Sequence, residues 1–214
     1  YAYDFSEGWA EVVLNNKSGF IDKTGKEVIP IKYDLVRVLP DNLVMVQLDN
    51  KWGFIDKTGK EVIPIQYDNV EPFSEGLASV KLNGKWGFID KTGKEIIPLK
   101  YDSADFFSEG LARVGLDGKY GFIDKTGRRV IPLKYDGDSS ITGKHEAFTE
   151  GLAAVNLNNK RGFVNRDGKE VIPLRYDHVH SFSGGLALAG LNGKFGYIDK
   201  TGKEVIPPIA APVE

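Results

Sequence analysis

A short block of sequence recurs along this chain with a fixed period, and that period constrains the fold more than any other feature. The block contains a glycine that recurs at a spacing of 34, 34, 34, 41 and 34 residues, and a proline that follows it keeps the same spacing. A period in this range is typical of repeat architectures, in which each supersecondary unit buries its apolar surface against its neighbours. The recurring residues are Gly19, Gly53, Gly87, Gly121, Gly162 and Gly196, and Pro30, Pro64, Pro98, Pro132, Pro173 and Pro207.

Each repeat contains two tight-turn sequences, which together predict a three-stranded antiparallel meander. In the third copy the first turn is Asn83-Gly84, and a two-residue type I′ hairpin needs positive φ at both positions, which Asn and Gly tolerate. The second is the Asp-Lys-Thr-Gly sequence of residues 90–93, a type I turn whose closing glycine takes the left-handed conformation as a bulge. The same pair of turns can be read in all six copies.

These turns also set which residues face each other across the strands. The first hairpin places Val80 opposite Gly87, and the second places Phe88 opposite Ile96. Both faces of the resulting sheet carry apolar side chains, so each sheet is expected to pack against a neighbour on both sides. Since a proline cannot donate to a β-ladder, we expect the third strand to end at Pro98.

We therefore predict an all-β fold, built as one repeat domain over residues 1–214. Each repeat closes on a Tyr-Asp pair, and the segment that opens the next repeat, Phe-Ser-Glu-Gly in the clearest copies, is irregular. Whether that segment contains a short fourth strand is left open by the sequence. The predicted units are residues 1–34, 35–68, 69–102, 103–136, 137–177 and 178–214.

Sheets that bury both faces can close into a ring or stack into an open array. The chain holds a nearly integral set of six units, which closure requires, and this favours a propeller-like closed ring. The alternative is an open β-solenoid or superhelical array. Two cap-like features favour the alternative: Ser18 stands where four of the other five copies carry an aromatic residue, and the last copy ends in a proline-rich sequence.

Composition excludes several classes of function. The 28 basic and 30 acidic residues are spread evenly, so no basic stripe is available to neutralise phosphates, and we expect no nucleic-acid partner. No run of apolar residues approaches the length of a membrane span in this segment. The absence of cysteine removes disulfides, thiolate metal sites and cysteine nucleophiles. We expect no enzyme activity and no cofactor.

The repeated motif resembles that of a known family. Lys-Trp-Gly-Phe-Ile-Asp, followed by a glycine, by Val/Ile-Ile-Pro, by Tyr-Asp and then by Glu-Gly-Leu-Ala, is similar to the bacterial WG repeat, also called the KWG repeat, and the resemblance covers the whole chain. The tryptophan of the motif is present only at Trp52 and Trp86. The resemblance implies a bacterial β-repeat module, often found in surface-exposed or multi-domain proteins, and it implies no catalytic residues. An extracellular or cell-surface location is therefore favoured over a cytoplasmic one.

The repeated polar residues have structural and functional interpretations. The Tyr-Asp pairs could line a channel, but packing of each tyrosine beside the proline and an Asx-turn for each aspartate are favoured. The Ser-Glu pairs, such as Ser74-Glu75, are expected to be solvated. The three tryptophans could form aromatic contacts with a ligand, although buried packing is favoured. These candidate aromatic contacts are Trp9, Trp52 and Trp86.

One insertion interrupts the period and is the best local candidate for a specific role. It spans residues 137–146, and loops displayed on a rigid scaffold often carry function. A metal site formed by His145 with His178 and His180 is conceivable, but surface histidines are favoured, and no metal ligand is assigned. The candidate binding residues of this loop are Asp138, Ser139, Ser140, Lys144, His145 and Glu146.

The sequence thus favours a non-catalytic scaffold that binds a protein partner or serves in surface display. Its mixed charge, regular repeats and lack of a catalytic cluster all agree with that function. A carbohydrate-binding, lectin-like module is the alternative, because aromatic residues and Asn/Asp-rich turns recur at one end of each repeat. The partner is therefore a protein or a glycan.

Overall fold

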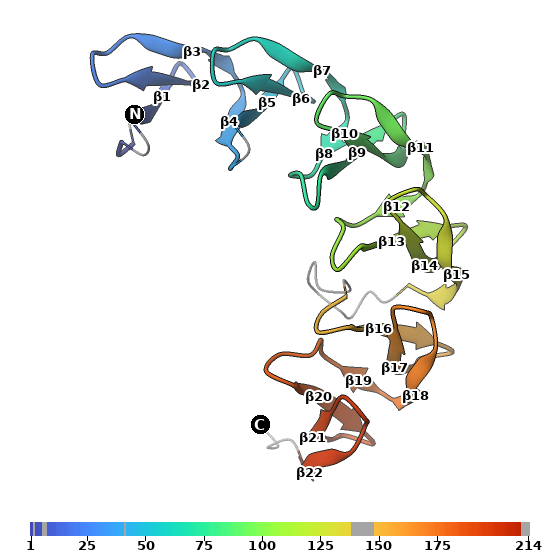
Figure 1. Cartoon of the computed structure of the whole chain (residues 1–214). Coiled ribbons are helices and arrows are strands. Elements are labelled where there is room, and N and C mark those ends of the chain that lie inside the picture. The colour runs from blue at the N-terminus through green and yellow to red at the C-terminus, as the bar shows by residue number, and fades with distance from the viewer. Residues whose placement is uncertain (2, 6–7, 41, 138–147, 211–214) are drawn as a thin grey trace. The chain divides into compact units, whose positions relative to one another are not determined.

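The computed structural model describes the chain except for residues 2, 6–7, 41, 138–147 and 211–214. The described residues form six antiparallel sheets and no helix, which we number sheet 1 to sheet 6 in chain order (Figure 1). Sheet 1 contains β1 (Trp9–Leu14), β2 (Lys17–Asp22) and β3 (Glu27–Tyr33). Sheet 2 contains β4 (Leu35–Val38), β5 (Leu43–Leu48), β6 (Lys51–Asp56) and β7 (Glu61–Tyr67). Sheet 3 contains β8 (Asn69–Val70), β9 (Leu77–Leu82), β10 (Lys85–Asp90) and β11 (Glu95–Tyr101). Sheet 4 contains β12 (Ser103–Ala104), β13 (Leu111–Leu116), β14 (Lys119–Asp124) and β15 (Arg129–Asp136). Sheet 5 contains β16 (Leu152–Leu157), β17 (Lys160–Asn165) and β18 (Glu170–Tyr176). Sheet 6 contains β19 (His178–Val179), β20 (Leu186–Leu191), β21 (Lys194–Asp199) and β22 (Glu204–Ala210).

The first hairpin of each sheet has the predicted geometry. Asn83 and Gly84 have φ values of 51° and 80°, and the two turn residues of the other five copies also have positive φ. The register follows from the turn, with Val80 opposite Gly87 as predicted. The meander is therefore confirmed.

The second turn is held by the side chain of its own aspartate. In sheet 3 the Gly93 amide donates to the Asp90 carbonyl at 3.0 Å, which closes a four-residue turn. One carboxylate oxygen of Asp90 also accepts the Thr92 amide at 2.8 Å, the Thr92 hydroxyl at 2.6 Å and the Lys94 amide at 3.1 Å. The Asp-Lys-Thr-Gly sequence thus specifies a turn that satisfies its own backbone donors.

Among the described residues, a fourth strand forms in four of the six sheets, which answers the question that the sequence left open for those repeats. It lies at the sheet edge beside the first strand of the meander, as β4, β8, β12 and β19. Three of these edge strands have two residues, whereas β4 has four, from Leu35 to Val38. The second repeat therefore has an unusually long edge strand.

The recurring glycine and proline meet in a bulge between the second and third strands. In sheet 2, Phe54 lies opposite Ile63 and Trp52 lies opposite Tyr67, so one residue of β6 faces three of β7. The glycine at this point, Gly53, has no room for a side chain, because a Cβ atom there would lie 2.7 Å from the Cα atom of Ile65. Each of the six recurring glycines meets the backbone of its third strand in this way.

The observed register of the third strand, which shifts both at this bulge and between Phe54 and Ile55, corrects two predictions. We predicted Phe88 opposite Ile96, but in the equivalent pairs of the other sheets the aromatic residue lies opposite the second apolar residue of the third strand, which corresponds to Ile97. We also predicted that the third strand ends at Pro98, but β11 continues to Tyr101. The equivalent Pro64 lies in the bulge between the pairs of Ile63 and Tyr67, so a proline there removes no donor from the ladder.

The core lies between consecutive sheets, and it confirms that both faces of a sheet are apolar. In one cluster Phe54, Ile63 and Tyr67 of sheet 2 pack against Val80 and Ile89 of sheet 3. The corresponding residues of sheets 1 and 2, of sheets 4 and 5, and of sheets 5 and 6 form three more such clusters. Sheets 1, 2, 4 and 5 therefore contribute their Phe-Ile-Tyr faces to the repeat that follows.

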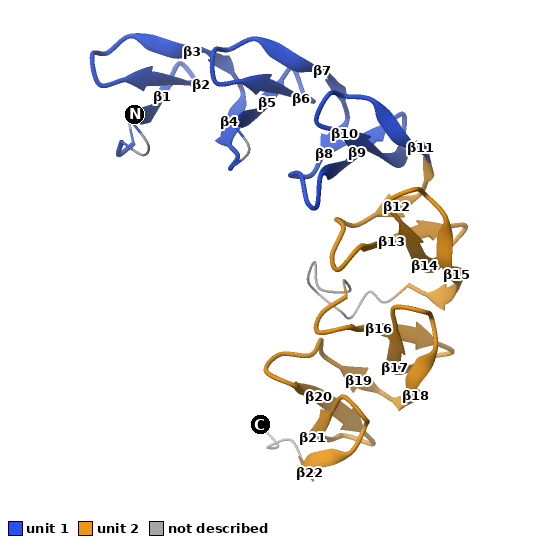
Figure 2. Cartoon of the chain, viewed as in Figure 1, with its two compact units in different colours: residues 1–99 blue, residues 100–214 orange. Residues whose placement is uncertain are grey.

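The chain divides into two compact units, residues 1–99 and residues 100–214 (Figure 2). Sheets 1 and 2 lie in the first unit and sheets 4 to 6 in the second, while β11 of sheet 3 extends across the boundary. No helix in the described part of the chain is long and apolar enough to cross a membrane.

Candidate functional site

The Tyr-Asp pairs build the interfaces between repeats. The five tyrosines are at most 5% exposed, which agrees with packing and not with the lining of a channel. The carboxylate of Asp34 accepts the Lys17 ammonium of its own repeat at 2.5 Å through Oδ1, and the amide of Asp49, in the first turn of the next repeat, at 2.7 Å through Oδ2. The expected Asx-turn is thus replaced by a bond that reaches into the following repeat.

The same arrangement recurs in the second unit. Asp136 accepts the Lys119 ammonium at 2.6 Å and the Asn158 amide at 2.7 Å, and Asp177 accepts the Lys160 ammonium at 2.6 Å and an amide of the following turn at 2.7 Å. One carboxylate thus links two sheets. The hydrogen bond that the lysine ammonium donates is the main cause that lowers the pKa of both aspartates below the usual value near 3.8.

These lowered pKa values predict acid unfolding. The aspartates of the second turns behave alike, and the hydrogen bond from the Thr126 hydroxyl is the main cause that lowers the pKa of Asp124 to about 2. A carboxylate with a lowered pKa stabilises the fold fully above its pKa in the unfolded chain, and that stability is lost as the pH falls through its folded pKa. We expect a melting temperature that changes little from about pH 7 to 5 and falls steeply below about pH 4, measured by circular dichroism.

The chain supplies a control for this prediction. In sheet 5 the turn aspartate is replaced by Asn165, whose side-chain oxygen still accepts the amides of Asp167 and Lys169 at 3.1 and 2.9 Å. An Asp124→Asn variant should therefore keep its turn, and its melting temperature should fall less in acid than that of the wild type. A melting temperature that stays level down to pH 2 would contradict the prediction.

The Ser108-Glu109 pair connects two repeats, which corrects the prediction of solvated Ser-Glu pairs for this copy, while Glu75 is exposed as predicted. The Ser108 hydroxyl donates to the carbonyl of Phe148 at 2.8 Å, and the Glu109 carboxylate accepts the amide of Gly151 at 2.9 Å. In the next copy the Glu150 carboxylate accepts an amide of the following loop and forms an ion pair with the Lys200 ammonium at 2.9 Å. We call the Phe-Ser-Glu-Gly segment and its equivalents the opening loops.

The opening loop of the second repeat departs from the pattern. In the alignment set by the period, Leu39 stands where other copies have phenylalanine, and Pro40 stands where they have serine or threonine. Ser74, Ser108, Thr149 and Ser183 each exchange two backbone hydrogen bonds with the leucine that opens the next strand. Proline has no amide to take part in such a pair, and here the Leu39 amide donates instead to the Leu43 carbonyl.

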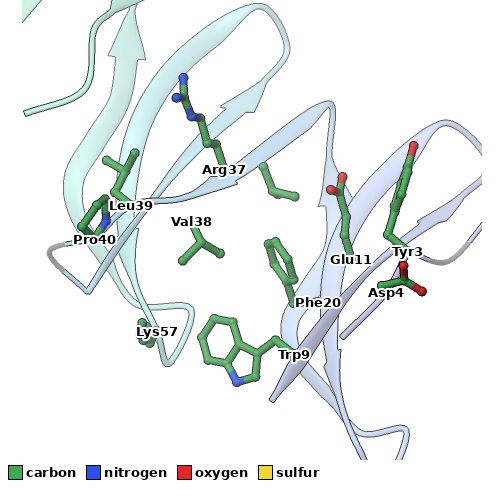
Figure 3. A pocket seen from close by; sticks show the side chains of 11 residues that line it. Tyr3, Asp4, Trp9, Glu11, Phe20, Arg37, Val38, Leu39, Pro40 and Lys57 are labelled. Atoms are coloured by element: carbon green, nitrogen blue, oxygen red, sulfur yellow. The ribbon is translucent and has the colours of Figure 1, made fainter. Parts of the chain in front are cut away.

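A groove lies beside this loop, between sheets 1 and 2, and has a volume of about 760 Å³ (Figure 3). Its middle is apolar, with Phe20 and Trp9 from sheet 1 on one side and Leu39 and Pro40 on the other, and Val38 between them. Val38 is 36% exposed. The lining residues are Tyr3, Asp4, Trp9, Glu11, Phe20, Val36, Arg37, Val38, Leu39, Pro40 and Lys57.

Charges of opposite sign lie on the two sides of the groove. Arg37 and Lys57 come from the second repeat, whereas Asp4 and Glu11 come from the first. The Lys57 ammonium lies 5.8 Å from the centre of the Trp9 ring, a distance at which a cation and an aromatic face attract each other. The groove thus combines an apolar floor with charged groups at its sides.

The three candidate tryptophans lie in different surroundings. Trp9 lines the groove, where its ring centre lies 5.8 Å from that of Phe20. Trp52 packs against the core between sheets 2 and 3, and the Trp86 ring lies 5.9 Å from the Lys81 ammonium. The other lining residues of the groove were missed by sequence reasoning, although the departure of residues 38–42 from the opening-loop pattern was a signal for them.

The remaining candidate site residues lie outside the described part of the chain. These are Asp138, Ser139, Ser140, Lys144, His145 and Glu146 of the insertion. Within the described residues, no group of three or more His, Asp or Glu side chains is placed to hold a metal ion. His178 lies over Phe195, with ring centres 5.8 Å apart.

Repeated antiparallel sheets, linked within each compact unit by carboxylates and apolar clusters, define an all-β repeat protein. The profile of the family described as "WG containing repeat" matches seven segments of this chain, residues 1–17, 19–52, 52–86, 86–120, 120–160, 162–195 and 195–209. The chain belongs to this family. The profile begins at the aromatic position of the middle strand, so six sheets give five nearly whole matches and two shorter ones at the ends.

Comparison with solved structures shows similarity of fold at low sequence identity. A structure described as a eukaryotic initiation factor has a TM-score of 0.58 and 10% identity, over 95% of this chain and 63% of that one. Hsv2 of Kluyveromyces lactis has a TM-score of 0.48 and 10% identity, over 91% and 70% of the two chains. The extracellular domain of a putative one-component system from B. thetaiotaomicron has a TM-score of 0.46 and 14% identity, over 97% and 34%. A search of curated proteins returned no match.

Proposed function

We propose that this chain is a non-catalytic scaffold that binds a protein partner, and that the groove between sheets 1 and 2 is a contact surface for it. The observation that carries the proposal is the opening loop of the second repeat, which departs from the pattern at the point where an apolar groove opens. Loops that vary on a regular scaffold are where binding residues concentrate.

The lining favours a protein partner over a glycan. Val36, Val38, Leu39 and Pro40 give one side of the groove an aliphatic surface, which suits an apolar side chain better than a hydroxylated ring. The described lining contains no serine, threonine, cysteine or histidine, and so no hydroxyl or thiol nucleophile paired with a histidine base. We therefore propose binding without chemistry.

Selection from a displayed-peptide library, together with a glycan array, tests this proposal. We expect enriched peptides whose binding is lost in a Val38→Glu variant, because a carboxylate there would lie in the apolar middle of the groove. Val205→Glu, at a side chain that is 50% exposed on sheet 6, is the matched control and should bind as the wild type does. The proposal fails if no peptide is enriched, or if the enriched peptides bind the Val38→Glu variant equally well.

Carbohydrate binding is the second candidate, and one observation favours it. The half-buried Trp9 ring lies in the same groove as the carboxylates of Asp4 and Glu11, which are suited to accept hydroxyl hydrogen bonds. Hits on the glycan array that disappear in the Val38→Glu variant would support this candidate in place of the first.

The closed ring and the extracellular location stay proposals. Closure would cover the apolar face of sheet 6, where Tyr197 and Ile206 are 41% and 46% exposed, while their counterparts Phe163 and Ile172 are buried. A markedly elongated particle in small-angle scattering would exclude the ring. The location is motivated by the family resemblance, and cleavage by a protease added to intact cells would test it.

A further inference from the structure

The structure shows what normally fills the space above the Phe-Ile-Tyr face of a sheet. The phenylalanine of one middle strand meets the phenylalanine of the next opening loop, and the ring centres lie 4.8 to 5.1 Å apart at three interfaces. Such a separation is favourable for aromatic pairs beyond the area that they bury. The three pairs are Phe54 with Phe73, Phe122 with Phe148, and Phe163 with Phe182.

The interface between sheets 1 and 2 lacks this second ring. Phe20 is the middle-strand phenylalanine there, and Leu39 stands at the position of its aromatic partner. Leu39 belongs to the cluster that includes Leu43, Met45 and Phe54, and not to the cluster that contains Phe20. The side chain that would cover Phe20 is thus both smaller and turned toward the following interface.

The groove lies where the missing ring would be. Phe20 and Leu39 both line it, and Figure 3 shows them on opposite sides of the open space. Phe20 is 8% exposed, whereas Phe54, Phe122 and Phe163 are at most 2% exposed. The first interface therefore has the middle-strand phenylalanine of the other interfaces but lacks the opening-loop phenylalanine that packs on it.

We propose that this groove binds an aromatic side chain of a partner polypeptide, in the position that an opening-loop phenylalanine occupies at the other interfaces. The inference rests on the proposed protein-binding function and names the residue that is recognised. The chain's own opening loops show the complementary sequence, Phe-Ser-Glu-Gly, in which a carboxylate follows the ring by two residues. Arg37 and Lys57 at the side of the groove are suited to receive such a carboxylate.

The test is a titration with a peptide copied from the chain itself. The probe is the capped pentapeptide Phe-Ser-Glu-Gly-Leu, which has the sequence of residues 73–77, and its analogue with alanine in place of phenylalanine is the control. The chain contains three tryptophans, so its ¹⁵N NMR spectrum contains three indole N–H signals. We expect the probe to shift the signal of Trp9, in the groove, and to leave those of Trp52 and Trp86 unchanged.

The expected effect is large enough to measure even when binding is weak. Burial of a phenylalanine side chain corresponds to about a ten- to hundredfold change in affinity, so the alanine peptide should bind at least about tenfold more weakly. Leu39→Phe supplies the missing ring from within the chain and should weaken binding of the probe by a similar factor. Val38→Glu should also weaken it, and circular dichroism checks that both variants are folded.

Different outcomes separate this inference from the proposed function. Equal affinity for the two peptides, no shift of the Trp9 signal at millimolar probe, or unchanged binding by both variants would overturn the inference. Groove-dependent library peptides without an aromatic residue would overturn it too, while the protein-binding function would stand. Failure of the library to yield any peptide, or displacement of the probe by a glycan, would overturn both.

Discussion

A Gly121→Ala variant should lose about 3 kcal/mol of unfolding free energy, because one added methyl group cannot be accommodated in the bulge. The Cβ atom would lie 2.4 Å from the carbonyl oxygen of Ile131 and 2.6 Å from that of Pro132. Both contacts are with backbone atoms, so no side chain can rotate away to relieve them. Urea unfolding followed by circular dichroism measures the loss.

A second glycine of the same sheet provides the control. Gly118 has a φ of 73° in the first hairpin, and a Cβ atom there would have nothing within 4 Å. Asparagine occupies this turn position in three other repeats, at Asn16, Asn50 and Asn159, with φ near 60° in each. Gly118→Asn should therefore cost less than about 0.5 kcal/mol. Similar losses for the two variants would show that crowding in the bulge is not the cause.

A Phe163→Ala variant should lose about 3–5 kcal/mol, since it removes a buried ring and leaves a cavity between two sheets. Phe163 is fully buried, and its ring centre lies 4.8 Å from that of Phe182 in the next repeat. The loss should fall on the second compact unit, whereas all three tryptophans lie in the first. The measurement therefore needs circular dichroism and not tryptophan fluorescence alone.

Tyr197 occupies the same repeat position in the last sheet and is the matched control. Its side chain is 41% exposed, whereas that of Phe163 is buried. Tyr197→Ala should cost about 1 kcal/mol. If the two variants were equally destabilised, contact with the following repeat could not be the source of the stability of Phe163.

The features that the sequence predicted correctly are those set by local geometry. The Asn-Gly hairpin at 83–84 fixes positive φ and register within a few residues, and the Asp-Lys-Thr-Gly turn satisfies its own donors. Apolar residues that alternate between the two faces of each strand correctly predicted that both faces of a sheet are buried. Local rules were therefore enough for the meander and for the six sheets.

The bulge was mispredicted because its cause is not local. A two-residue shift between the second and third strands depends on the backbone of the third strand passing close over a glycine such as Gly53. A rule based on local sequence predicts only that strand pairing ends at the proline. The role of the repeat-closing aspartate was hidden for the same reason, because the partners of Asp34 lie 17 and 15 residues away.

Only part of the candidate site could be predicted from the sequence. Trp9 could be chosen as an aromatic residue outside the usual position, and it does line the groove. The groove itself depends on the direction in which Leu39 turns, and that is decided by packing against the next repeat. The insertion at 137–146 stays a separate candidate.

The carboxylate that links consecutive repeats has a consequence for how the chain can change its length. Asp34 binds partners 17 residues before it and 15 residues after it, and Asp177 does the same with Lys160 and Asn192. A duplicated or deleted stretch of 34 residues among the regular repeats leaves those offsets unchanged, so each new junction there inherits a complete set of partners. Gene duplication can therefore lengthen or shorten such an array in whole repeats without a compensating mutation at the junction.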